Sequence, residues 1–247
     1  MKRWKLLWVI KMEVLNDLYD YGLKIYQDDH LFKFSLDSLL LTEFLKIEKS
    51  DKKLLDICSG NAPLPLIIGK KYDVEITGIE IQKEIYDLAE KSIKENKLTN
   101  IKMLNCNAKD LKNYFPGNNF DIITCNPPFF KVNKTSLINE EQKKAIARHE
   151  ITITLKEIFE IVKYFLKDNG TFYLVHRPER LEEIISLANT NKLHVKEIIF
   201  IYSESKKIAI MVLLKMKKNA RLGVKVKSVE INHNTKTYQN IFKDVKE

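Results

Sequence analysis

The sequence predicts an α/β domain with a doubly wound, mostly parallel sheet and helices on both faces. Two observations lead to this prediction. Short apolar runs alternate with longer segments of helical periodicity, and such alternation is typical of parallel sheets, whose strands need crossover helices. The last two apolar runs are separated only by Ser203-Glu204-Ser205. That connection is too short for a crossover helix, so this pair of strands must be antiparallel.

The elements follow in order along the chain. Ser35 is expected to cap a first helix over residues 36–45. Seven strands are expected near residues 53–57, 74–80, 101–105, 120–125, 170–175, 195–202 and 207–215. Four further helices are expected near residues 64–71, 82–96, 154–167 and 178–190. Residues 131–150 are polar and rich in lysine, and we expect them to form a mobile loop above the active site, because a lid must open to admit a large substrate.

The charge of the chain favours a polyanionic partner. The formal net charge is +9 and the isoelectric point is near 9.2, which is unusual for an enzyme of small metabolites. From Lys206 to Lys227 there are eight Lys or Arg residues and no Asp or Glu. The candidates for contacts with a phosphate backbone are Lys131, Arg148, Lys215, Lys217, Lys218 and Arg221. The alternative is a solvated strand edge that lysines protect from aggregation.

The length of 247 residues fits one compact unit, since α/β domains of this size are common. We divide the chain into a basic arm and lead-in segment, a main domain and a small basic appendage, over residues 1–34, 35–216 and 217–247. The alternation from Val224 to Lys227 would be an edge strand or part of that appendage. Two tryptophans stand among four cations before Met12, and this segment is either an RNA-contacting arm or a mis-assigned start.

The three cysteines have no paired spacing, which argues against a disulfide framework and against a bound zinc ion. The sequence has no cleavable signal and no apolar stretch of about 20 residues, so a cytoplasmic protein without a membrane partner is expected. Cys58, Cys106 and Cys125 lie at or just beyond the ends of the first, third and fourth expected strands. We expect all three thiols to line the ligand crevice there. The alternative, above all for Cys125, is a small core residue.

The strongest motif is Asn126-Pro127-Pro128-Phe129, which ends the apolar run over residues 120–125. The prolines stop the strand, because neither can donate to a sheet ladder. The asparagine amide oxygen and the Pro127 carbonyl can each accept one N–H, and Phe129, with Phe130 behind it, can stack on a ring. The motif therefore suits a planar ring that carries an exocyclic amine. The alternative is a proline-rich loop in which the asparagine caps a turn.

A second feature is a cofactor-binding corner. Leu54 to Pro63 predicts a short apolar strand, a small-residue turn and the start of a helix, which is where open α/β sheets bind cofactors. Val74 to Glu80 predicts a second strand ending in a carboxylate that can accept both hydroxyls of a ribose. The turn contains only Gly60, where a dinucleotide site would need three glycines. The acid and the asparagine motif, at the ends of two strands, are the stronger signal.

Together these motifs resemble the class I S-adenosylmethionine-dependent methyltransferases, and among them the amino-methyltransferases with an Asn-Pro-Pro-aromatic motif. The most similar family is the bacterial tRNA (adenine-N6)-methyltransferases that modify adenosine 37 in a valine tRNA. The resemblance covers nearly the whole chain from Met12 onward. The segments that carry it are residues 22–27, 32–41, 55–65, 78–82, 126–131, 147–150 and 175–181.

The resemblance implies a Rossmann-like sheet of seven strands with one antiparallel strand, and S-adenosylmethionine as the cofactor. The cofactor-binding residues that it implies are Asp56, Cys58, Gly60, Glu80, Ile81, Asn107, Ala108 and Asn126. The catalytic residues would be Asn126, Pro127, Pro128 and Phe129, and Phe130 would contact RNA with the cations named above. Ala62 stands where the family usually has glycine. Asn107 stands where an aspartate commonly holds the cofactor's adenine amine; its amide oxygen can accept the same bond, so we expect weaker affinity.

The partner that this resemblance implies is the anticodon loop of a tRNA, where a base leaves its stack at least cost. His149 is a candidate for a catalytic role, but a structural role is expected for a histidine between Arg148 and Glu150. A monomer is favoured. Two other hypotheses remain: methylation of a protein glutamine or another nucleic-acid amine, and an RNA-binding module that has lost its cofactor. Retention of Asp56 and Glu80 argues against the last.

Overall fold

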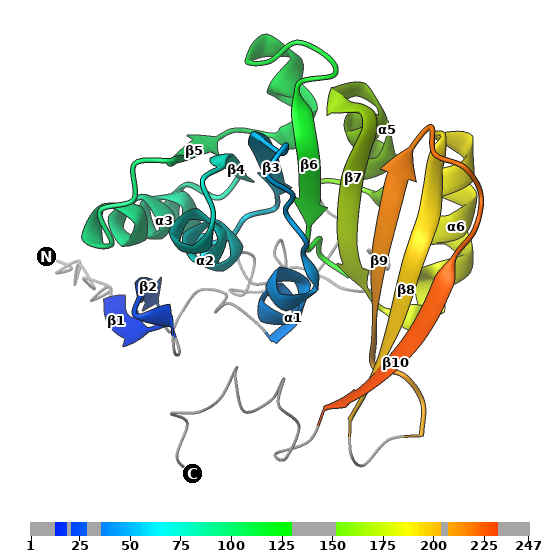
Figure 1. Ribbon diagram of the computed structural model, residues 1–247. Helices are drawn as coiled ribbons and strands as arrows, with labels where there is room; N and C mark the ends of the chain where they lie inside the picture. Colours follow the sequence, from blue (N-terminus) through cyan, green and yellow to red (C-terminus); the bar gives the residue numbers. More distant parts are fainter. Residues whose placement is uncertain (1–12, 19–20, 29–35, 130–151, 204–206, 232–247) are drawn as a thin grey trace, which may run out of the picture.

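Eight strands form the central sheet, in the order β10-β8-β9-β7-β6-β3-β4-β5 (Figure 1). The computed structural model describes residues 13–18, 21–28, 36–129, 152–203 and 207–231. The strands are β3 (Lys53–Ile57), β4 (Glu75–Glu80), β5 (Ile101–Asn105), β6 (Phe120–Cys125), β7 (Leu166–His176), β8 (Leu193–Ser203), β9 (Met211–Lys218) and β10 (Lys225–Ile231). All seven strands that the sequence predicts are therefore present.

Strand direction confirms a mostly parallel sheet with one reversed strand. β9 pairs antiparallel with both β7 and β8, whereas the other described pairs of this sheet are parallel. The sheet has one strand more than the seven expected, and this strand, β10, is the edge strand offered as one alternative for the alternation from Val224 to Lys227. β10 adds to the free edge of β8, with Lys225 opposite Glu197 and Ile231 opposite Ser203. Its side chains are mostly exposed, because it is an edge strand, and this explains the basic and apolar alternation without a buried run.

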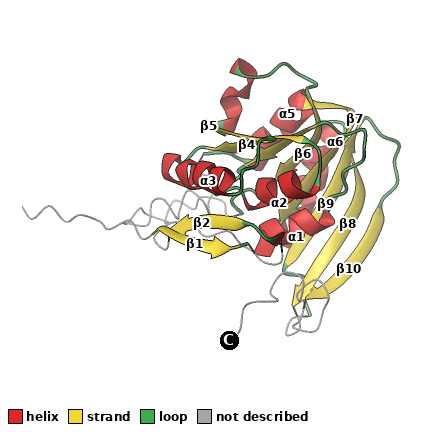
Figure 2. Cartoon of the chain, turned by 60° about the vertical axis from the view of Figure 1, so that its left-hand side comes forward, coloured by secondary structure: helices red, strands yellow, loops and turns green. Residues whose placement is uncertain are grey.

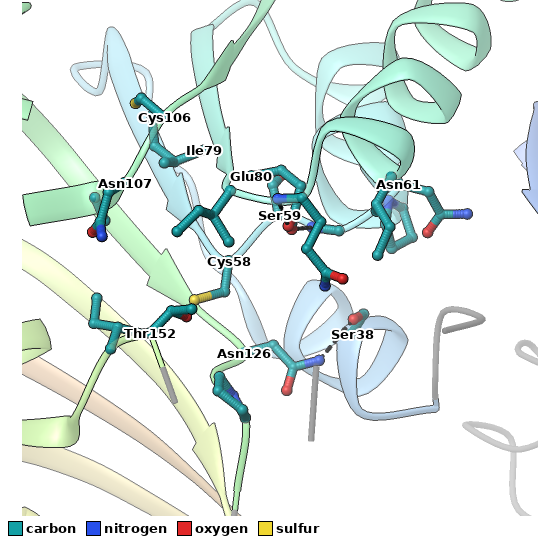
Figure 3. A pocket seen from close by; sticks show the side chains of 18 residues that line it. Ser38, Cys58, Ser59, Asn61, Ile79, Glu80, Cys106, Asn107, Asn126 and Thr152 are labelled. Carbon is teal, nitrogen blue, oxygen red and sulfur yellow. Dashed lines mark hydrogen bonds between the residues drawn. The ribbon is translucent and has the colours of Figure 1, made fainter. Parts of the chain in front are cut away.

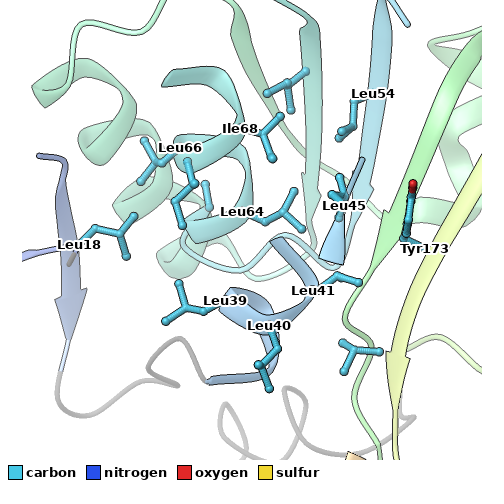
Figure 4. Close-up of a cluster of buried hydrophobic side chains, with 14 of the residues drawn as sticks. Leu18, Leu39, Leu40, Leu41, Leu45, Leu54, Leu64, Leu66, Ile68 and Tyr173 are labelled. Carbon is cyan, nitrogen blue, oxygen red and sulfur yellow. The ribbon is translucent and has the colours of Figure 1, made fainter. Parts of the chain in front are cut away.

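Helices cover both faces of the sheet (Figure 2). They are α1 (Leu36–Phe44), α2 (Pro63–Lys71), α3 (Lys83–Glu95), α5 (Leu155–Phe165) and α6 (Leu181–Thr190), with the 3₁₀ turns η2 (Ala108–Asn113) and η3 (Pro178–Arg180). Leucines of α1 and α2 pack with Tyr173 of β7 in one buried cluster (Figure 4). Phe159 and Phe165 of α5 pack with Phe172 on the opposite face. No described helix is both long and apolar enough to cross a membrane.

A small hairpin, β1 (Glu13–Asp17) with β2 (Lys24–Asp28), forms a separate sheet that the sequence did not predict. It packs on α3, where the Tyr26 amide donates to Ser92 Oγ (2.9 Å). The Tyr26 carbonyl accepts from Asn61 Nδ2 (3.0 Å), which lies in the turn after β3. The hairpin therefore braces that turn from outside the main sheet. Its strands are short and carry charged residues, so no clear period-2 pattern marks them.

Candidate active site

A cavity opens where the parallel strands β3, β4, β5 and β6 end (Figure 3). Its walls come from the turns that follow these four strands, from α1 and from the segment that leads into α5. This is the position that open α/β sheets use for ligands, because the loops diverge from the carboxyl ends of the strands. A capping box at Thr154 and Glu157 fixes the start of α5 and so holds the neighbouring Thr152 and Ile153 in the cavity wall.

The turn after β3 is tight. Cys58, Gly60 and Ala62 all have left-handed backbone angles, with φ of 61°, 59° and 67°. Only glycine adopts this region freely, and a side chain there costs roughly 1–2 kcal/mol. The Ser59 amide donates to the Ile79 carbonyl (2.9 Å), which ties the turn to β4. The turn can lie this close to β4 because residue 78 is a glycine. A Cβ at Gly78 would lie 2.7 Å from Ser59 Oγ, which is too close for a real contact.

Glu80 ends β4 with its carboxylate in the cavity wall, although the residue is only 7% exposed. One carboxylate oxygen accepts from the Gly60 amide (3.1 Å) and the other from the Gln82 amide (2.8 Å). Burial raises the pKa of Glu80, and these backbone donors partly offset that effect. Each carboxylate oxygen has a further lone pair, so Glu80 can still accept hydroxyls from a ligand in the cavity.

Asp56 is the next-to-last residue of β3; it does not line the cavity and is 3% exposed. Its carboxylate accepts from Ser59 Oγ (2.7 Å) and from Thr124 Oγ1 (2.6 Å). Ser59, in contrast, does line the cavity. Asp56 therefore supports the turn from behind, and the direct contact with a cofactor that the sequence suggested is not what this geometry favours. Burial raises the pKa of Asp56 to about 6, and the two hydroxyl donors oppose the shift.

Replacing Asp56 with asparagine should stabilise the fold in a pH-dependent way. The folded state holds the Asp56 proton more tightly than the unfolded chain, so wild-type stability falls as the pH rises from about 4 to about 6. The substituted amide does not titrate and keeps its hydrogen bonds with the two reorientable hydroxyls. The stability gained by Asp56→Asn should grow by about 3 kcal/mol over this window and stay constant above it. Denaturant unfolding at pH 4, 5, 6 and 8 measures this, and a pH-independent difference contradicts it.

Asn126 follows β6 and reaches the cavity from the side opposite Glu80 (Figure 3). Its Nδ2 donates to Ser38 Oγ on α1 (2.9 Å). Pro127 and Pro128 are buried, and Pro128 also lines the cavity. With the amide nitrogen bound by the protein, the amide oxygen of Asn126 is the end available to accept a hydrogen bond from a ligand.

Phe129 is half-buried beside β7 and does not line the cavity. Its ring meets the His176 ring edge-on, with centroids 5.2 Å apart, and the Arg177 guanidinium lies 5.1 Å from its centroid. One face of Phe129 is therefore covered by a cation, and stacking on a ligand could use only the other face. Burial and the nearby Arg180 lower the pKa of His176 to about 4, so this histidine is neutral. Phe130 lies outside the described residues.

The segment after β5 supplies another wall. Asn107 and Ala108 line the cavity, and Ile81, 38% exposed, lines it from the turn after β4. Asn107 Oδ1 also caps η2 by accepting from the Lys109 amide (3.0 Å). The sequence predicted that this amide oxygen accepts a hydrogen bond from the adenine amine of the cofactor. It already accepts one from Lys109, so only one lone pair remains for the cofactor. This is a further reason to expect weak cofactor affinity.

Two of the three thiols lie in the cavity wall, Cys58 and Cys106. Cys125 is fully buried beneath Cys58, and burial together with that neighbouring thiol raises its pKa well above the usual value. The expectation that all three would line the crevice was therefore wrong for Cys125, which is a core residue. Within the described part of the chain, no group of three or more His, Cys, Asp or Glu residues is arranged to hold a metal ion.

Comparison with known families settles the class of the chain. The family model described as "Methyltransferase domain" matches residues 48–243, which is most of the sequence. The chain belongs to this methyltransferase family. The match spans the turns after β3, β4, β5 and β6, so it includes nearly all of the cavity wall described above.

Curated relatives cover almost the full length of this methyltransferase. A protein of Flavobacterium psychrophilum named tRNA1(Val) (adenine(37)-N6)-methyltransferase is 26% identical over 87% of this chain and 92% of its own length. A protein of Cytophaga hutchinsonii with the same name is 24% identical over 90% of this chain and 92% of its own length.

Solved structures show the same fold. A predicted O-methyltransferase from Agrobacterium tumefaciens aligns with a TM-score of 0.62 at 17% identity, covering 80% of this chain and 88% of that one. TYW2 from M. jannaschii, solved in complex with AdoMet, aligns with a TM-score of 0.57 at 16% identity, covering 87% and 90%. The architecture of the methyltransferase is therefore Rossmann-like, as the sequence predicted.

The predicted RNA-contacting cations of β9, and Arg221 after it, do not gather at the cavity. Because β9 runs against the other strands, its last residue returns to the amino ends of the parallel strands, the end of the sheet opposite the cavity. Arg221 lies beyond that point and is exposed. Lys215 is half-buried over the Tyr173 ring (5.5 Å), and burial followed by the charge of Lys217 lowers its pKa. Lys131, like Arg148, lies outside the described residues.

Lys218 has a structural role instead of the RNA contact predicted for it. Only 8% exposed, it donates to Asn118 Oδ1 (2.8 Å) and to the carbonyls of Lys163 and Leu166 (both 2.7 Å). Lys218→Met should therefore lower the free energy of unfolding by about 2–4 kcal/mol, since it leaves these acceptors without their donor. Lys217→Met, the neighbouring control, should change it by less than about 0.5 kcal/mol. Chemical denaturation measures both, and equal effects would contradict the assignment.

Sequence reasoning missed several cavity residues: Ser38, Ser59, Asn61, Gln82 and Thr152. Ser59 and Asn61 could have been predicted, because they lie in the turn that the sequence already identified as the cofactor-binding corner. Ser38 lies 88 residues before Asn126 in the sequence. It belongs to residues 32–41, one of the segments that carry the family resemblance, but that resemblance indicated no role for it.

Proposed function

We propose that this methyltransferase transfers the methyl group of S-adenosylmethionine to N6 of an adenosine in tRNA, with adenosine 37 of a valine tRNA as the target. The observation that carries the proposal is the polarity of Asn126. Its amide nitrogen is bound to Ser38, which leaves the oxygen as an acceptor in the same cavity as Glu80. The names of the two relatives described above support the choice of substrate.

The residues of the cavity fit S-adenosylmethionine, which supplies an activated methyl group on a good leaving group. Glu80 would accept the ribose hydroxyls, and Ile81 would pack against the adenine. Gln82 Oε1 is buried in the cavity wall without a hydrogen-bond partner among the described residues, and a ligand donor would satisfy it. A Cβ on Gly60 would meet no protein atom within 4 Å, so glycine here keeps that space open to a ligand. The φ of 59° at this residue also favours glycine.

The acceptor nitrogen needs orientation more than it needs a base. The lone pair of an adenine amine is delocalised into the ring, which makes this nitrogen a weak nucleophile. When Asn126 Oδ1 and the Pro127 carbonyl accept hydrogen bonds from its two N–H groups, the lone pair is free to point at the methyl group. Orientation and electrostatics then supply most of the rate, and no strong base is required.

A tRNA substrate is proposed because the target base must be able to reach the cavity. A base must leave its stack to enter a cavity at the end of a sheet, and in a single-stranded anticodon loop this costs least. The net charge of +9 supports a polyanionic substrate. We place the enzyme in the cytoplasm with this substrate, as a monomer.

The nucleotide assignment can be tested with two transcripts. The enzyme is incubated with S-adenosylmethionine and an unmodified valine tRNA transcript, or the same transcript with guanosine at position 37, and the digested nucleosides are analysed by mass spectrometry. We expect N6-methyladenosine only from the first. Equal methylation of both would retain the reaction but reject the position. Binding of RNA without any binding of S-adenosylmethionine, measured by calorimetry, would favour the cofactor-free alternative.

A further inference from the structure

Helix α1 holds Ser38 rigidly at the edge of the cavity. Leu39 and Leu41 anchor the helix in the core, with exposed fractions of 1% and 0%. Beyond its last turn, the Tyr173 hydroxyl donates to the Lys46 carbonyl (3.1 Å). The Ser38 carbonyl accepts from Thr42 Oγ1 (2.7 Å), within the same helix. The position of the Ser38 hydroxyl is therefore set by the fold and not by a ligand.

We infer that Ser38 is a positioning residue that binds the Asn126 amide nitrogen and so holds the amide with its oxygen toward the substrate. A hydroxyl can accept or donate, and accepting from Nδ2 is the arrangement that leaves Oδ1 free for the acceptor amine. Its Oγ accepts from Asn126 Nδ2 at 2.9 Å, and both side chains line the cavity (Figure 3). This inference rests on the proposed function, because it concerns the hydrogen bond from Asn126 Oδ1 to the acceptor amine. It gives a role to the segment over residues 32–41, whose chemistry the sequence alone did not explain.

The orientation matters because the two ends of an amide are chemically opposite. Oδ1 accepts hydrogen bonds, whereas Nδ2 only donates them. An adenine amine presents two hydrogens, so a flipped Asn126 would set donor against donor. The torsion that turns the amide has a broad, nearly two-fold profile, and the side chain alone has little preference between the two orientations.

The prolines that follow Asn126 leave its amide oxygen without a local backbone donor. Asparagine side chains commonly accept a hydrogen bond from the backbone amide two residues ahead, which forms an Asx turn. Neither Pro127 nor Pro128 has an N–H, so this local partner does not exist. The prolines keep the amide oxygen unengaged, and Ser38 binds the nitrogen. The motif and the helix thus act together on one side chain.

Kinetics of three variants test the inference. Ser38→Ala removes the acceptor for Nδ2, and we expect kcat for tRNA methylation to fall about tenfold, with the KM for tRNA and the Kd for S-adenosylmethionine within about twofold of wild type. Ser38→Thr restores the hydroxyl and should recover most of kcat. Thr190→Val removes a hydroxyl that donates within helix α6 to the Ser186 carbonyl (3.0 Å), outside the cavity wall, and should have wild-type kinetics. Unchanged kcat in Ser38→Ala, an equal loss in Ser38→Thr, or a loss confined to cofactor Kd would overturn the inference.

An activity-independent readout separates this inference from the proposed function. In ¹⁵N-labelled enzyme the Asn126 side-chain NH₂ resonances are assigned by their loss in Asn126→Asp. We expect Ser38→Ala, but not Ser38→Thr, to shift them and to speed their exchange with water. If wild type does not methylate tRNA and this signature is still present, the proposed function fails and the Ser38 contact stands. If the resonances are insensitive to Ser38→Ala, the positioning role is rejected.

Discussion

Replacing Asn126 with alanine is expected to reduce the rate of methyl transfer to tRNA by a factor on the order of 10²–10³, while S-adenosylmethionine still binds within several-fold of wild type. In the proposed mechanism the amide acts on the acceptor nitrogen, so its loss removes an interaction that develops with the reaction and not one that holds the cofactor. Single-turnover kinetics give the rate, and calorimetry gives the cofactor Kd.

Asn113 offers a matched control, because it is exposed at the end of η2 and outside the cavity wall. Asn113→Ala should leave both quantities unchanged. Wild-type turnover in Asn126→Ala would remove this residue from the mechanism. A loss of cofactor binding as large as the loss of rate would assign it to cofactor binding instead.

Replacing Glu80 with alanine should have the opposite pattern, raising the Kd for S-adenosylmethionine by about 100-fold. The carboxylate is the acceptor proposed for the ribose, and hydrogen bonds to a charged group contribute roughly 1.5–3 kcal/mol each. It also accepts from the Gly60 and Gln82 amides, so its loss loosens both turns of the cavity wall. Calorimetric titration measures the affinity, and thermal unfolding reports the looser turns.

Glu75 begins the same strand and is exposed, which makes Glu75→Ala the control. It should bind the cofactor as wild type does. An unchanged Kd in Glu80→Ala, with the protein still folded, would mean that Glu80 only braces the turns.

The fold was predictable because its signals are local. Each of β3 to β6 is a short apolar run, and four of the predicted strand spans match the observed ones to within one residue at either end. The short connection after β8 identified the reversed strand. The hairpin of β1 and β2 escaped notice, since its strands are short and half-exposed and depend on α3 for support.

The position of a side chain in the cavity wall was predictable where the residue lies at the end of a strand, as for Glu80 and Asn126. It was not predictable where a role depends on which neighbour a side chain meets. Asp56 faces two hydroxyls and not the cavity, and Lys218 faces carbonyls and not solvent. The sequence shows neither contact. A run of cations is typical of an exposed segment, and the buried position of Lys218 follows only from the course of β9 in the folded sheet.

Incubation of the enzyme with S-adenosylmethionine carrying a deuterated methyl group, in a mixture of unmodified tRNA and a protein fraction, tests the central claim most directly. Mass spectrometry of the separated tRNA nucleosides and protein peptides shows where the label goes. We predict the label in N6-methyladenosine of the tRNA and nowhere else. Label on glutamine side chains of protein, or on another nucleoside of the tRNA, would contradict the claim that this cavity methylates the exocyclic amine of adenosine.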